Sequence, residues 1–130
     1  MNGEMSIYKV DVDGLIIGEC EFISAYTPRF SVSRSGDISV YAGRNWIFIK
    51  NRTLARLFEG EDIQRIYLNS EGVFIICDSV VIYRNMSNMD FSKTLLDHDE
   101  LIVSSVASGG KIIVTDFRGR EYRIDSDLRG

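Results

Sequence analysis

Short runs of β-branched and aromatic residues recur along almost the whole chain, and they predict strands rather than helices. The clearest runs are Ile7–Val10, Leu15–Ile17, Ile38–Tyr41, Trp46–Ile49, Val73–Ile76, Val80–Tyr83, Leu101–Val103 and Lys111–Val114. Residues of this kind fit the pleated, half-buried surface of a sheet. Apolar spacing of three and four residues, which is typical of a helix, occurs only over 51–59 and 86–96, and both segments are short. The pattern predicts much antiparallel sheet and little helix.

Turn residues separate the predicted strands. They include Asp13-Gly14, Ser35-Gly36-Asp37, Glu71-Gly72, Gly109-Gly110 and Arg118-Gly119. Only one proline, Pro28, interrupts the pattern. Short strands at regular spacing with glycine turns are typical of all-β sandwiches, barrels and propellers. We therefore expect an all-β, antiparallel fold.

The turn glycines also recur at a regular step. Gly36, Gly72 and Gly110 are separated by 36 and 38 residues. Residues 63–76 and 102–114 both read as an apolar residue, a polar pair, an apolar residue, a glycine turn and an apolar strand. A four-stranded step just under about 40 residues is near the period of a propeller blade. We interpret the chain as one all-β domain, 1–130, with about three blade-like repeats of roughly 36–40 residues. The alternative fold is a β-sandwich or a barrel. The expected repeats are 22–58, 59–96 and 97–130.

Three motifs between residues 59 and 125 have the order of a known repeat. Asn69-Ser70-Glu71-Gly72 forms a turn, Leu96-Asp97-His98 precedes a strand, and Arg118–Asp125 holds a glycine turn followed by a closing strand. Together they resemble the Ser-Pro-Asp-Gly-type turn, the Gly-His element and the closing Asp-Gly-x-x-x-x-Trp-Asp strand of WD repeats, which implies the blades of a β-propeller. The chain departs from that family because no Trp-Asp pair ends a repeat, Asp97 stands in place of Gly, and His98 is the only histidine. A hydrogen-bond network through histidine therefore cannot recur in every repeat.

About three blades cannot close a ring, because propellers typically have 4 to 8 blades. An open ring leaves strand edges whose unpaired backbone groups invite pairing with another chain. We expect a homo-oligomer with edges at Ile7–Val10 and Tyr122–Ile124, and a two-fold dimer would supply about six blades. In the alternative, a self-contained sandwich or barrel, Ile7–Val10 covers the last strand of the same chain.

Composition and charge narrow the possible partners. The chain has 130 residues, of which 45% are hydrophobic and 26% charged, as in ordinary globular proteins. The net charge is -4, and acidic residues are interleaved with the basic ones, which argues against nucleic-acid binding. No secretory signal and no membrane-spanning run is visible, so we expect a cytoplasmic protein without a membrane partner. Cys20 and Cys77 lie far apart without zinc-site spacing and are predicted to be two separate thiols.

The sequence contains no catalytic motif and no metal-binding motif. The densest polar run is Asp97-His98-Asp99-Glu100. Neighbouring residues of a strand point to opposite faces, so these side chains cannot all converge on one ion. We predict a loop whose side chains are solvated or hydrogen-bonded locally. With one histidine and no nucleophile near it, we expect no enzyme activity, no catalytic residue, no metal site and no cofactor.

The candidate binding residues are aromatic and basic. Tyr26, Arg29, Arg44 and Trp46 lie close together in the sequence and belong to types enriched in binding hot spots. Trp46 and Phe48 are two residues apart and share one face of a strand, so a core role for both is the alternative. The leading hypothesis is a non-catalytic protein–protein interaction module of propeller-like repeats that blocks or scaffolds a protein partner. The alternative is a small-ligand or carbohydrate-binding β protein that uses the same four residues.

Overall fold

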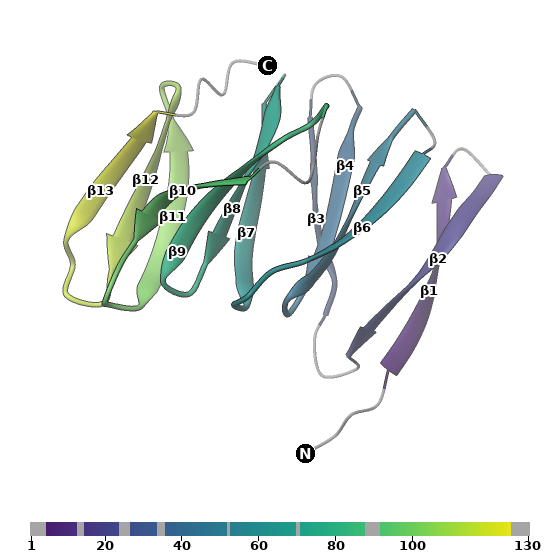
Figure 1. Cartoon of the computed structure of the whole chain (residues 1–130), viewed down its shortest axis with the longest axis horizontal. Coiled ribbons are helices and arrows are strands. Elements are labelled where there is room, and N and C mark those ends of the chain that lie inside the picture. Colours follow the sequence, from purple (N-terminus) through teal and green to yellow (C-terminus); the bar gives the residue numbers. More distant parts are fainter. Residues whose placement is uncertain are drawn as a thin grey trace. The chain divides into compact units, whose positions relative to one another are not determined.

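The computed structural model describes residues 5–12, 15–23, 27–33, 36–51, 53–69, 71–87 and 92–125. Within these ranges the chain forms strands joined by turns and short loops, and none of these residues lies in a helix (Figure 1). The strands are β1 (Met5–Val12), β2 (Leu15–Ile23), β3 (Arg29–Val32), β4 (Ile38–Ala42), β5 (Asn45–Lys50), β6 (Thr53–Phe58), β7 (Ile63–Leu68), β8 (Gly72–Cys77), β9 (Val80–Asn85), β10 (Ser92–Asp97), β11 (Ile102–Ser108), β12 (Lys111–Asp116) and β13 (Glu121–Asp125). All strand pairs are antiparallel, which confirms the predicted all-β class.

The strands form four sheets in which consecutive strands lie side by side (Figure 1). The first is the hairpin β1–β2, followed by the four-stranded sheets β3–β6 and β7–β10 and the three-stranded sheet β11–β13. None of them closes into a barrel. The segments 51–59 and 86–96, whose spacing is helix-like, instead hold β6 and β10, the last strands of the two four-stranded sheets. Among the residues described, no helix could cross a membrane.

The chain divides into two compact units, Met1–Asp62 and Ile63–Gly130, and each is described by itself. The first holds β1–β6 and the second holds β7–β13. The three larger sheets begin at Arg29, Ile63 and Ile102, so successive sheets start 34 and 39 residues apart. The expected repeats contain these sheets in the same order, and β10 ends one residue beyond the second repeat.

In the first unit, both faces of the β3–β6 sheet carry buried apolar side chains. Residues directly opposite each other on neighbouring strands share a face, so the register assigns each side chain to one of the two faces. One face holds the buried cluster of Ala42, Ile47 and Ile49, against which Ile38, Val40 and Leu54 pack. The other holds Tyr41, Trp46 and Phe48, each at most 4% exposed. The hairpin β1–β2 contacts this sheet through β2, which lies against β6.

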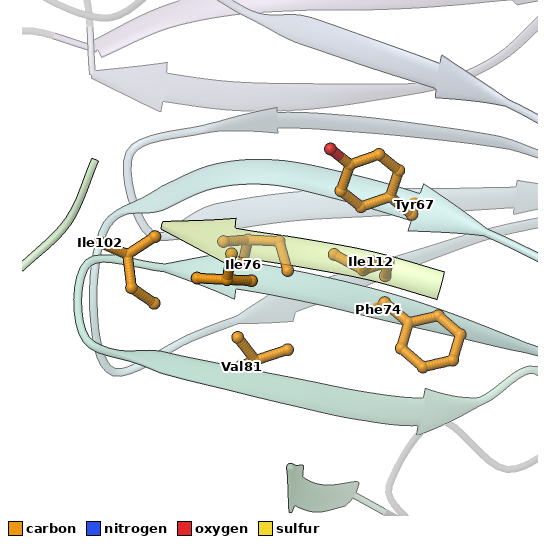
Figure 2. Close-up of a cluster of buried hydrophobic side chains, with 7 residues drawn as sticks. Tyr67, Phe74, Ile76, Val81, Ile102 and Ile112 are labelled. Atoms are coloured by element: carbon orange, nitrogen blue, oxygen red, sulfur yellow. The ribbon is translucent and has the colours of Figure 1, made fainter. Parts of the chain in front are cut away.

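In the second unit, the sheets β7–β10 and β11–β13 pack face to face. Figure 2 shows the core between them, in which side chains of β7, β8 and β9 meet those of β11 and β12. The buried members are Tyr67, Phe74, Ile76, Val81, Ile102, Ile112 and Val114. Along the strands these side chains alternate with ones on the opposite face of the sheet, as the pleat requires, and on β8 that opposite face is buried too.

Polar contacts join the same two sheets at β7 and β11. Nε2 of Gln64 donates to the carbonyl of Ile102 at 2.6 Å, and the hydroxyl of Tyr67 lies 3.0 Å from that of Ser105. The first strands of the two sheets are therefore neighbours across the stack.

Within the β7–β10 sheet, a close approach occurs at Gly72 on β8, where an added Cβ would overlap the Tyr83 ring of β9.

Candidate functional site

Of the predicted binding residues, Arg29, Arg44 and Trp46 lie in the first unit, and Tyr26 falls outside the described residues. Arg29 on β3 is opposite Tyr41, which is opposite Trp46 on β5, so the three form one row across the sheet. Arg44 lies in the exposed turn between β4 and β5, where its Nε is 3.5 Å from a carboxylate oxygen of Asp62. The structure thus brings these three residues to one sheet, with both arginines at the surface.

Trp46 is part of the core of the first unit. It is 1% exposed, and its indole Nε1 donates to Oε2 of the buried Glu59 at 2.7 Å. The backbone N–H of Glu59 in turn donates to the carbonyl of Arg44 at 2.8 Å. Trp46 therefore holds the loop after β6 against the turn that carries Arg44, and its own ring is not at the surface.

His98 in the second unit bonds to a distant residue rather than to its neighbours in the polar run. Its Nε2 lies 2.9 Å from Oδ2 of Asp116 and 3.3 Å from the hydroxyl of Tyr122. Oδ2 of Asp116 also accepts from Nε of Arg120 at 3.0 Å. Its Oδ1 accepts from the backbone N–H groups of Arg118 and Arg120, both at 2.9 Å. This network joins the loop after β10 to the turn between β12 and β13.

These contacts keep Asp116 ionised. Burial raises the pKa of Asp116. The hydrogen bonds to His98 and to two backbone N–H groups lower it by more, so the net pKa lies well below its usual range. A carboxylate with such a low pKa is a poor general base at neutral pH. Among the described residues, no group of three or more His, Cys, Asp and Glu side chains could hold a metal ion. The arrangement supports the turn, and the Asp116 carboxylate itself is a poor proton acceptor.

Two large apolar side chains are exposed beside this network. Phe117 in the β12–β13 turn is 72% exposed, and Leu101 before β11 is 49% exposed. The N–H of Phe117 donates to the carbonyl of Leu101 at 2.8 Å, which holds the two residues together. Nε of Arg118 lies 2.9 Å from a carboxylate oxygen of Glu100 beside them. We call Leu101, Phe117 and Arg118 the loop-end patch.

The loops that carry the patch are fixed by backbone hydrogen bonds to the neighbouring sheet. The N–H of Ile102 donates to the carbonyl of Asp78 at 2.7 Å, and that of His98 donates to Ser79 at 2.9 Å. Sequence analysis did not identify Leu101 and Phe117 as binding residues. The one available signal was the position of Phe117 directly before the predicted turn Arg118-Gly119, where a phenylalanine has little chance of being buried.

Comparisons with known proteins give no relatives: no family model, no curated protein and no solved structure matches this chain.

Proposed function

We propose that the chain is a non-catalytic protein–protein interaction module built from propeller-like repeats, and that its loop-end patch binds a protein partner. The observation that carries the proposal is the exposure of Phe117 and Leu101 on loops with fixed backbones. Phenylalanine and arginine are both enriched in protein–protein interfaces relative to the rest of the protein surface. A patch held in place before binding loses little conformational entropy when the partner docks.

Matching hydrogen bonds in two sheets support the repeat part of the proposal. The first residue after β6, Glu59, donates its N–H to the carbonyl of Arg44, in the turn between the second and third strands of its sheet. The first residue after β10, His98, donates its N–H to Ser79, in the equivalent turn of the next sheet. Two four-stranded sheets thus end in the same backbone contact although the side chains differ.

The polar network supports a role without catalysis. Both carboxylate oxygens of Asp116 accept hydrogen bonds, and Nε2 of His98 lies within hydrogen-bond distance of that carboxylate and of the Tyr122 hydroxyl. These side chains rigidify the turn that presents Phe117. The proposed setting is the cytoplasm, where a buried thiol such as Cys77 stays reduced.

Site-specific photocrosslinking tests the binding role of the patch. A photoreactive amino acid at position 117 should crosslink one discrete protein in cells of the source organism, and the same group at the exposed Lys93 should not. With that protein purified, Phe117→Ala should weaken binding by about thirtyfold or more, the loss typical of a hot spot. Lys93→Ala should leave the affinity unchanged. Equal affinities for both variants would contradict the proposed site.

A further inference from the structure

Among the described residues, the sheet β11–β13 ends at β13, whose outer edge has no partner strand. The sheets β3–β6 and β7–β10 have four strands each, whereas β11–β13 has three and the hairpin β1–β2 has two. Within the part of the chain that the structure describes, β13 pairs only with β12, and β1 pairs only with β2. The free edge of such a strand exposes backbone donors and acceptors that can pair with another chain.

Along β13, side chains of two kinds alternate. Tyr122 and Ile124 lie on the face that packs against β7–β10. Glu121, Arg123 and Asp125 lie on the outer face and are exposed. A strand that pairs with the free edge must match this alternation, because a slip of one residue moves every side chain to the wrong face.

We propose that β1 of a second copy of the chain pairs antiparallel with β13 and becomes the fourth strand of its sheet. In one register, Val10 of the second copy lies opposite Ile124, and Val12 lies opposite Tyr122. Apolar residues thereby extend the rows that form the core of the second unit. All sheets of the chain are antiparallel, so the added strand continues the existing order.

The same register pairs opposite charges on the outer face. Lys9 of the second copy lies opposite Asp125, and Asp11 lies opposite Arg123. Opposite charges directly across two strands are stabilising, whereas like charges there are destabilising. Sliding β1 by two residues in one direction puts Lys9 opposite Arg123, and sliding it in the other puts Asp11 opposite Asp125. Counting only pairs between residues of β1 and residues of β13, the proposed register is the one of these three that has no like-charge pair.

Exposed apolar side chains on the first strands of two sheets favour the same association. On the outer face of β11–β13, Val106 is 53% exposed and lies opposite the half-buried Ile113. On the β3–β6 sheet, Phe30 is 71% exposed and Val32 is 61% exposed, both on the first strand. We infer that these side chains meet between copies, β3 of one copy beside β11 of the other, in the way that β7 and β11 already lie within one copy.

The second copy, rather than the same chain, supplies the strand because one chain has too few sheets to close a ring. This step rests on the propeller-like repeats of the proposed function, since propellers typically need four or more blades. A two-fold axis repeats the junction, so each copy gives its β1 and receives the other's. Two copies then provide six larger sheets, within the usual range of blade numbers.

Charge exchange at exposed positions tests the pairing directly. Light scattering after size exclusion should give twice the chain mass. Lys9→Glu places a like charge opposite Asp125, and it should weaken the dimer by about tenfold, because the pair occurs twice. Adding Asp125→Lys should restore the dimer to within about twofold, whereas adding Glu121→Lys instead should not. All three residues are exposed, and unchanged circular dichroism of each variant will show that the fold is retained.

Two further variants separate this proposal from the partner-binding site. Val106→Asp should yield a monomer, because it puts a charge among the apolar side chains that meet between copies. Phe117→Ala, in the loop-end patch, should keep the dimer and lose only partner binding. A monomeric mass at micromolar concentration with a dilution-independent melting temperature overturns the dimer. Rescue of Lys9→Glu by Glu121→Lys instead of Asp125→Lys overturns the antiparallel register.

Discussion

Ile112 gives the sharpest test of the face-to-face packing in the second unit. It lies on β12, the central strand of its sheet, and is 0% exposed in the core shared with β7–β10 (Figure 2). Ile112→Ala removes three carbon atoms, worth about 2.4 kcal/mol of transfer free energy at about 0.8 kcal/mol each. Because two opposed sheets cannot collapse freely into the gap, a cavity adds to this, and the free energy of unfolding should fall by about 3–4 kcal/mol.

Urea unfolding followed by far-ultraviolet circular dichroism measures this loss at fixed protein concentration. Ile112→Val removes one carbon atom and should cost about 1 kcal/mol. Lys111→Ala is the matched control, since Lys111 is the exposed neighbour on the same strand, and it should change stability by less than about 0.5 kcal/mol. If Ile112→Ala is no more destabilising than Lys111→Ala, the two sheets do not pack on each other as described.

Three further substitutions test other contacts. Asp116 has a lowered pKa, so its stabilising effect is complete above about pH 4 and is lost as the pH falls further; Asp116→Asn should flatten the acid limb of a melting-temperature profile, and an unchanged limb would contradict this. Trp46→Phe should cost about 1–3 kcal/mol in chemical unfolding, because Glu59 loses a buried donor; an unchanged midpoint would show that the bond contributes nothing. Gly72→Ala should cost about 1–3 kcal/mol through overlap with the Tyr83 ring, and Tyr83→Leu in the same chain should recover part of it.

The central strands were predictable because packing on both sides demands apolar residues there. The runs Trp46–Ile49 and Val73–Ile76 lie within β5 and β8, which are inner strands of their sheets. β6 and β10 were not predicted, since an outer strand faces solvent along one edge and its pattern is weaker. Their sequences carry a few apolar residues at helix-like spacing, and only pairing with β5 and β9 makes them strands.

The candidate site was harder to predict because it depends on contacts distant in sequence. Trp46 was identified by residue type, which does not reveal that its ring is buried and bonded to Glu59. The bond between His98 and Asp116 spans 18 residues and arises only when the two sheets pack together. For Phe117 the one local signal was its position directly before the predicted turn Arg118-Gly119. The prediction of a loop before a strand is confirmed for residues 98–101, but Asp97 ends β10, and His98 bonds to the distant Asp116 instead of locally.

The main-chain bonds from Ile102 to Asp78 and from His98 to Ser79 have a consequence for how such a chain can diverge. Every residue except proline carries the same N–H and C=O groups, so neither the bond within the β7–β10 sheet nor the bond from β11 to that sheet depends on which side chains occupy the four positions. Substitutions can accumulate there while the spacing of the sheets is kept. Loops of different sequence can therefore occupy these positions, provided that their length is preserved and no proline replaces a donor.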